Sequence, residues 1–135
     1  MNKYYSVFLI VLVLTSPVAF IDIPEYTVYT ATGDSMLPTH SECGISVIRE
    51  DIPVSELHQK QDIVLVEHNE SLMLHRFIDY GYGYEFNKTT AEKSLDDNKK
   101  YIKTKGDNNA LSEFTYASEY MGSEVIHIDI PNLIC

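Results

Sequence analysis

Basic residues are scarce in this chain of 135 residues, with 10 lysines and arginines against 20 aspartates and glutamates and a formal net charge of −10. A protein that binds nucleic acid needs cationic side chains to neutralise phosphates, so the charge balance argues against DNA or RNA as a partner. The simplest interpretation of the acidic excess is a solvated, repulsive surface.

Cysteine is also rare, with Cys43 and Cys135 as the two examples. They can pair in an oxidising compartment, but the sequence does not decide whether they come within bonding distance. Four histidines invite a metal interpretation: His40, His58, His68 and His127. Their spacing matches no ligand pair two to four residues apart, and the cysteines are isolated. We therefore expect neither a metal nor another cofactor.

Long apolar runs are limited to one, at residues 4–21, which contains no charged residue. Its eighteen positions reach roughly 27 Å as a helix, close to the hydrocarbon thickness of a bilayer. Lys3 precedes the run and Asp22 follows it, which predicts a cytoplasmic N-terminus. We expect a single-pass anchor at residues 1–22, in the cell membrane or the endoplasmic-reticulum membrane, and one extracytoplasmic domain at 23–135. A cleaved signal peptide ending at Ala19 is the alternative.

Beyond this run no segment shows the 3.6-residue period of an amphipathic helix, and short β-rich runs recur between turn residues. The expected strands are residues 26–30, 44–48, 62–67, 72–79, 101–103 and 124–130. The polar stretch 68–71 is short enough to make a hairpin of the third and fourth. Residues 51–60 suit one short helix. The spacing favours a mainly β domain, a closed or half-closed barrel, over alternating strands and helices.

A candidate nucleophile, Ser35, stands in the turn motif Gly-Asp-Ser-Met-Leu-Pro-Thr at positions 33–39. The motif follows the first expected strand, so the hydroxyl can be exposed at a sheet edge. Asp34 and Pro38 suit a turn on their own, and a plain turn serine is the alternative interpretation. A serine hydroxyl is a weak nucleophile at neutral pH, so a catalytic role requires a base close to it.

The candidate base is His75, which lies in the apolar run 72–78, and no lysine occurs between residues 61 and 86. An imidazole with an ordinary pKa of about 6.5 is largely unprotonated at neutral pH. The alternative is a packed core histidine. A third motif, Lys-Gly-Asp-Asn-Asn at 105–109, supplies Asp107, whose carboxylate could orient His75 or support the serine loop, although Gly-Asp-Asn is also an ordinary turn.

In this order behind an apolar N-terminus, the three motifs resemble type I signal peptidase, and histidine in place of lysine makes the chain similar to the archaeal and endoplasmic-reticulum branch. Gln-Asp-Ile-Val at 61–64 and Tyr-Met-Gly-Ser-Glu-Val at 120–125, with Pro131, extend the resemblance over nearly the whole chain. It implies a signal-peptidase-like half-closed β-barrel and a membrane-bound serine endopeptidase. Such an enzyme cleaves signal peptides from exported preproteins and needs no cofactor.

The resemblance also implies roles for individual residues. Ser35 would be the nucleophile, His75 the general base, and Asp107 the carboxylate that orients the imidazole. Substrate or oxyanion contacts would come from the residues around the serine: Gly33, Asp34, Met36 and Pro38. Several relatives carry a serine at the position of Gly33, so the oxyanion would here depend mainly on backbone N–H groups. A second acidic residue often follows the Gly-Asp-Asn turn, where this chain has Ser112 and Glu113.

Two other functions fit the same features. An inactive or specialised membrane-anchored β domain would bind or process a single envelope partner through the same groove. A self-cleaving repressor-type peptidase also carries Gly-Asp-Ser-Met, but it needs a lysine base and a cytoplasmic setting, and neither is apparent here.

Overall fold

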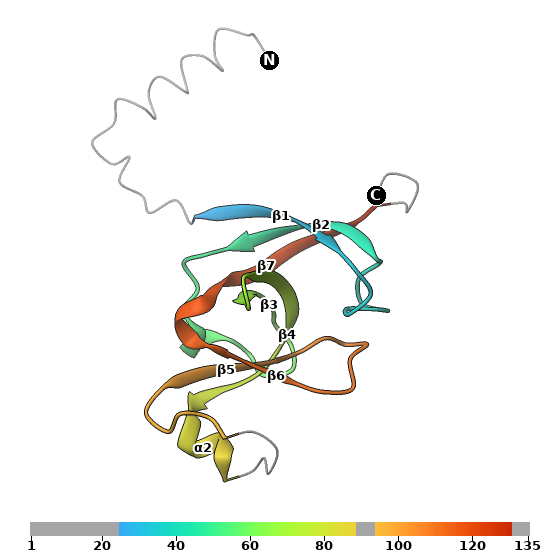
Figure 1. Ribbon diagram of the computed structural model, residues 1–135. Coiled ribbons are helices and arrows are strands. Elements are labelled where there is room, and N and C mark those ends of the chain that lie inside the picture. Colours follow the sequence, from blue (N-terminus) through green and yellow to red (C-terminus); the bar gives the residue numbers. More distant parts are fainter. Residues whose placement is uncertain (1–24, 89–93, 131–135) are drawn as a thin grey trace, which may run out of the picture.

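The computed structural model describes residues 25–88 and 94–130 as a β domain with short helical turns (Figure 1). In chain order the elements are β1 (Tyr26–Thr32), β2 (Cys43–Arg49), η1 (Val54–Glu56), β3 (Ile63–His68), β4 (Ser71–Tyr82), α2 (Gly83–Asn87), β5 (Lys100–Lys105), β6 (Glu113–Tyr116), η2 (Ala117–Glu119) and β7 (Tyr120–Asp129). The expected mainly β fold is confirmed. The expected anchor at 1–22 lies outside the described residues, and within the described ranges no helix is long and apolar enough to cross a membrane.

The seven strands form one antiparallel sheet in the order β1-β2-β7-β3-β4-β5-β6. The last strand, β7, therefore lies in the middle, where it pairs with both β2 and β3. It joins the β1–β2 pair, whose connection carries Ser35, to the β3–β4 hairpin, which carries His75. Two motifs that are far apart in the sequence are thus held on one continuous sheet.

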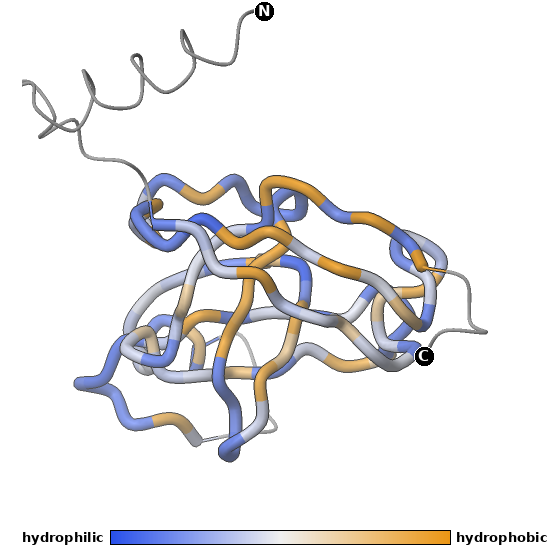
Figure 2. Tube along the Cα trace, turned by 90° about the horizontal axis from the view of Figure 1, so that it is seen from above, coloured by the Kyte–Doolittle hydropathy of each residue, from blue (hydrophilic) through white to orange (hydrophobic). Residues whose placement is uncertain are grey.

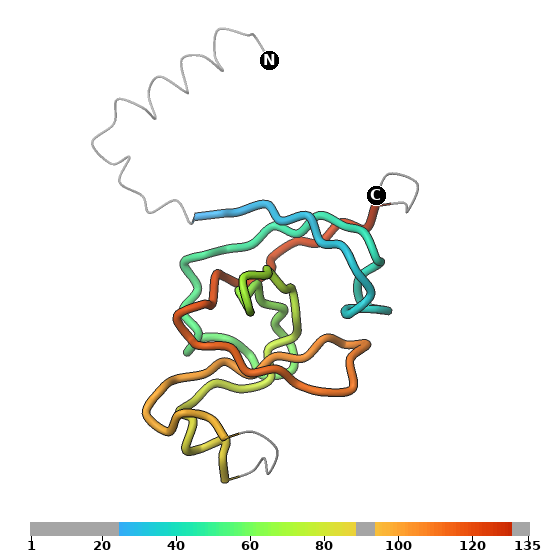
Figure 3. The backbone as a smooth tube through the Cα atoms, viewed as in Figure 1, coloured from blue at the N-terminus to red at the C-terminus, as the bar shows by residue number. Residues whose placement is uncertain are grey.

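The sheet is strongly curled, as the tube in Figure 3 shows. Register shifts interrupt the pairing of β2 with β7, of β3 with β7, and of β4 with β5. Such irregularities bend a strand and increase its twist. Because of the curl, β6 contacts β3 although β4 and β5 lie between them in the sheet. The expected half-closed barrel is therefore observed in its coarse form.

The core lies on both faces of β3, because its first four side chains are all buried. One cluster contains Ile63 and Leu65 with Met36, and the other contains Val64 and Val66 with Phe77. Full burial of a side chain of this size contributes about 1.5–3 kcal/mol. Figure 2 shows apolar stretches along the strands and hydrophilic residues at the bends. Met36 connects the core to the loop that carries Ser35, because its buried side chain belongs to the first cluster.

The details differ from expectation in three places. The helix expected at 51–60 is a single 3-10 turn, Val54–Glu56, which begins after Pro53. The strand β6 and the helix α2 were not predicted, because elements of four and five residues are too short to show a period.

The hairpin at 68–71 is confirmed, and Asn69 and Glu70 both have positive φ, as a two-residue turn of the I′ kind requires. Cys43 is buried and disulfide-bonded, whereas Cys135 lies outside the described residues.

Candidate active site

Ser35 lies in the connection between β1 and β2, which folds into a compact loop at residues 33–42. At its base the N–H of Gly33 donates to the carbonyl of Glu42 at 2.9 Å, and farther along the N–H of His40 donates to the carbonyl of Met36 at 3.0 Å. Gly33 has φ +115, a backbone conformation that favours glycine. Buried Met36 holds the loop from below, so Ser35 stands half-buried above the core.

The turn after β5 holds the loop from the other side. The N–H of Asn108 donates to the carbonyl of Ser35 at 2.8 Å. Gly106 allows this approach, since a Cβ at that position would lie 2.6 Å from the Ser35 carbonyl oxygen. The turn of the Lys-Gly-Asp-Asn-Asn motif therefore packs against the serine loop through its backbone.

His75 lies on β4 opposite Val64 of β3, and it is only 3% exposed. Its Nδ1 is 3.3 Å from Oε2 of Glu113, at the start of β6. Both atoms are buried, and they attract each other when the imidazole is protonated. Their geometry does not make a hydrogen bond. Burial lowers the pKa of His75, and the carboxylates of Glu113 and Asp107 oppose this effect without reversing it.

Ser35, His75 and Glu113 line the same cleft, which has a volume of about 250 Å³. Its other walls come from β1, the serine loop, β4 and the turn after β5: Tyr29, Ala31, Thr32, Gly33, Met36, His40, Ser41, Leu72, Met73, Leu74 and Asn109. Within the described ranges the hydroxyl and the N–H of Ser35 have no hydrogen-bond partner. Both groups are therefore free to act on a ligand in the cleft.

Of the two positions expected for Asp107, the structure places it at the serine loop and not at the imidazole. Its carboxylate accepts two hydrogen bonds from the guanidinium of Arg76, with Nε–Oδ1 at 2.7 Å and Nη2–Oδ2 at 2.6 Å, and a third from the hydroxyl of Thr39. These bonds lower the pKa of Asp107, with Arg76 as the main cause. No hydrogen bond or ion pair among the described residues joins Asp107 to His75. The carboxylate beside the imidazole is that of Glu113, and Asp107 instead ties the serine loop to the strand that carries His75.

The expected substrate-binding residues divide into two groups. Gly33 and Met36 line the cleft. Asp34 and Pro38 are exposed and do not line it. The carbonyl of Asp34 instead accepts the N–H of Leu37 at 3.1 Å, so this residue helps to shape the turn.

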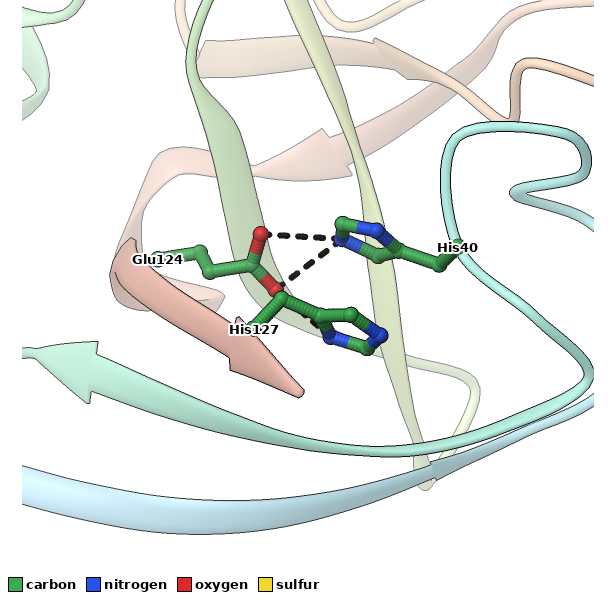
Figure 4. A group of neighbouring side chains, drawn as sticks. All are labelled: His40, Glu124 and His127. Carbon is green, nitrogen blue, oxygen red and sulfur yellow. Dashed lines mark hydrogen bonds and ion pairs between the residues drawn. The ribbon is translucent and has the colours of Figure 1, made fainter. Parts of the chain in front are cut away.

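The histidines include a grouping that the sequence spacing did not predict. His40, which lines the cleft, lies next to Glu124 and His127 of β7 (Figure 4). His40 and Glu124 are 84 residues apart in the chain, so only the position of β7 beside β2 brings them together.

A comparison with models of known protein families finds no match, and no curated protein sequence matches the chain.

Proposed function

We propose that this protein is a membrane-bound serine endopeptidase that cleaves N-terminal signal peptides from exported preproteins. The observation that carries the proposal is one cleft lined by a serine with a free hydroxyl, a buried imidazole and a carboxylate at Nδ1 of that imidazole. A nucleophile, a base and a group that orients the base are the three parts that acyl transfer requires. The signal-peptide substrate is supported by the order of the motifs and by the apolar N-terminal run.

Each group has a defined task in the reaction. Glu113 lies beside Nδ1 of His75 and favours a proton on that nitrogen. Nε2 is therefore the nitrogen that takes the proton from Ser35. The Ser35 oxygen attacks the scissile carbonyl, and the N–H of Ser35 donates to the oxyanion that forms. His75 then protonates the leaving amine, and an acyl-enzyme remains. Water, activated by the same imidazole, releases the acyl group and restores the serine.

The cleft also restricts the substrate. A volume of about 250 Å³ is at the small end of ligand sites and suits a few small side chains. Ala31 and Gly33 line the cleft and, because they are small, leave space in it. β1 is the edge strand on this side of the sheet, so an extended peptide can pair with its free edge while small side chains enter the cleft.

The decisive experiment is incubation of the detergent-solubilised full chain with a preprotein. The products are identified by mass spectrometry. We expect one cut at the signal-peptide junction, and no cut with Ser35→Ala, because that change removes the attacking atom and little packing. A wild-type chain that cleaves none of a panel of preproteins, or a Ser35→Ala chain that cleaves them equally well, contradicts the proposal.

A further inference from the structure

Three side chains outside the proposed catalytic group converge on one buried point beside the cleft: His40, Glu124 and His127 (Figure 4). Their side chains are no more than 8% exposed, and one nitrogen or oxygen from each lies within 4.8 Å of the others. We propose that these residues form a binding site for one Zn²⁺ ion. This inference does not depend on the proposed peptidase activity.

A β-bulge in β7 creates the ligand pair. Residues three apart on a regular strand face opposite sides of the sheet, so Glu124 and His127 would normally point apart. Here Ile48 pairs with Glu124 and Val47 with Ile126, which leaves Val125 as the extra residue. Glu124 and His127 therefore face inward together. Bulges often re-aim side chains in this way next to functional sites.

The donor atoms are close enough for one ion to bind all three after the His40 ring turns. Nε2 of His40 lies 2.9 and 3.1 Å from the two oxygens of Glu124, and Nδ1 of His127 lies 3.5 Å from Oε2. In a tetrahedral zinc site with bonds of about 2.0–2.2 Å, neighbouring ligand atoms are about 3.3–3.6 Å apart, so the His127–Glu124 pair has this spacing and the His40–Glu124 pair is held closer by its hydrogen bonds. Two imidazoles and one carboxylate are a donor set that zinc prefers, whereas magnesium and calcium prefer oxygen alone.

The groups around the three ligands complete the site. Oγ of Ser46 lies 2.7 Å from Oε2 of Glu124 and 2.8 Å from Nδ1 of His127, where it can support a fourth ligand such as water. Nε2 of His127 lies 3.0 Å from Oδ1 of Asp129. Because the single proton of the Ser46 hydroxyl is donated to Glu124, Nδ1 of His127 donates to Ser46 Oγ, and an entering ion takes the place of this Nδ1 proton while Asp129 holds the other proton on Nε2. Metal-binding histidines usually have such a partner.

Zinc entry requires one ring to turn. The rings of His40 and His127 are stacked, with centroids 3.5 Å apart and planes only 5° from parallel. A metal bonds to an imidazole close to the ring plane, so one ion cannot serve two parallel rings. His127 is fixed by Ser46, by Asp129 and by the close backbone of Gly44, where a Cβ would lie 2.5 Å from the ring.

His40 is therefore the ring that turns. Its side chain is hydrogen-bonded only to Glu124 among the described residues, and the entering ion replaces the proton between them. His40 belongs to the loop that carries Ser35 and lines the cleft. A turn of the His40 ring would therefore change one wall of the cleft.

The test uses the full chain in detergent, purified without a polyhistidine tag and stripped of metal. Zn²⁺ is titrated in competition with a chromophoric chelator, and thermal unfolding is followed in parallel. We expect one zinc per chain and a higher Tm with zinc, because an ion that binds only the folded state stabilises it. Mg²⁺ should produce neither effect.

Variants assign the site. His40→Ala and Glu124→Gln should each weaken zinc binding by more than about 100-fold, and Asp129→Asn by about 10–100-fold, the range expected for an outer partner of a ligand. His40→Ala leaves β7 intact, which separates ligand loss from unfolding, and circular dichroism checks each variant. The exposed His58, changed to alanine, is the matched control and should bind like wild type. His75→Ala should also retain zinc.

Two outcomes overturn the proposal. One is a wild-type chain that takes up no zinc. The other is a folded His40→Ala or Glu124→Gln chain that binds zinc as tightly as wild type, which would make the stacked pair a hydrogen-bonded support for the serine loop only.

Discussion

At the scale of single residues, the proposed mechanism divides between two carboxylates beside β4 the tasks that one acid performs in a serine–histidine–aspartate triad. Glu113 lies at Nδ1 of His75, whereas Asp107 is held by Arg76 and Thr39. The first is placed to stabilise the imidazolium during catalysis. The second is placed to hold the serine loop against β4. Substitution at each position should therefore affect different measurements.

Glu113→Gln should lower kcat of the proposed peptidase by about 10²–10⁴-fold, because the imidazole loses the charge that stabilises its protonated form. Asp107→Asn should instead lower the free energy of unfolding by about 1.5–3 kcal/mol, the usual cost of losing hydrogen bonds to a charged group. Steady-state cleavage and urea unfolding of both variants measure the two effects. The assignment fails if Asp107→Asn reduces kcat more than Glu113→Gln does.

If the proposed mechanism holds, the burial of His75 sets the pH dependence of cleavage. Burial lowers the pKa of this imidazole below its ordinary value of about 6.5, so the neutral base persists to lower pH. We expect kcat/KM to rise with a single ionisation whose midpoint lies below about 6.5. Glu113→Gln should move this midpoint to lower pH, since the carboxylate favours the protonated imidazole. A midpoint well above 7 would exclude His75 as the base.

The buried imidazole also affects stability with a defined sign. A histidine whose pKa is lower in the folded state binds fewer protons there than in the unfolded chain. Its neutral form therefore supports the fold fully above the unfolded pKa of about 6.5, and that contribution is lost as pH falls through the folded pKa.

At the scale of elements, the candidate active site depends on two connections packed backbone to backbone. The loop between β1 and β2 carries Ser35, and the turn between β5 and β6 reaches it through Asn108 and Gly106. Neither connection is regular structure. Their mutual position is set by the curled sheet, so a small change in the turn moves the nucleophile.

Gly106→Ala should displace the turn from the serine loop. The new Cβ would lie 2.6 Å from the Ser35 carbonyl oxygen, and overpacking of this kind typically costs about 1–3 kcal/mol. We expect a lower free energy of unfolding and a reduced kcat. Asn108→Ala is the control, because this exposed residue keeps its backbone N–H to the Ser35 carbonyl and the change adds no atoms to the turn. Equal kcat for Gly106→Ala and wild type would show that the turn does not position Ser35.

The elements were predicted better than the partners of the site residues. Alternating β-rich runs and the polar hairpin at 68–71 are local signals, and they found six of the seven strands. Ser35 and His75 were proposed because each stands in a recognisable motif, and the structure places both at one cleft. Glu113 was named as the acidic residue after the Gly-Asp-Asn turn, but its place beside His75 and the pairing of Arg76 with Asp107 depend on the β4–β5 register and on the path of the following turn, which have no local signature. The His40–Glu124–His127 group depends on a bulge and on long-range pairing, so its spacing in the chain gave no indication.

At the scale of the whole molecule, the proposed function requires the β domain to work at a membrane surface. The described domain begins directly after the apolar run 4–21, so an anchor there would hold the cleft close to the bilayer. Several apolar side chains are exposed on β1 and β7, the strands on either side of β2: Tyr26, Val28, Ile126 and Ile128. The anchor remains a prediction from the sequence.

Deletion of residues 1–22 should abolish membrane association that resists carbonate washing, because no other segment of the chain has eighteen consecutive uncharged, mostly apolar residues. In intact cells a tag placed after Cys135 should be accessible to external protease, and a tag before Met1 should not, as a cytoplasmic N-terminus requires. As a control, deletion of the polar stretch 89–93 should leave membrane association unchanged. Recovery of a soluble mature chain that begins at Phe20 would establish a cleaved signal peptide in place of the anchor.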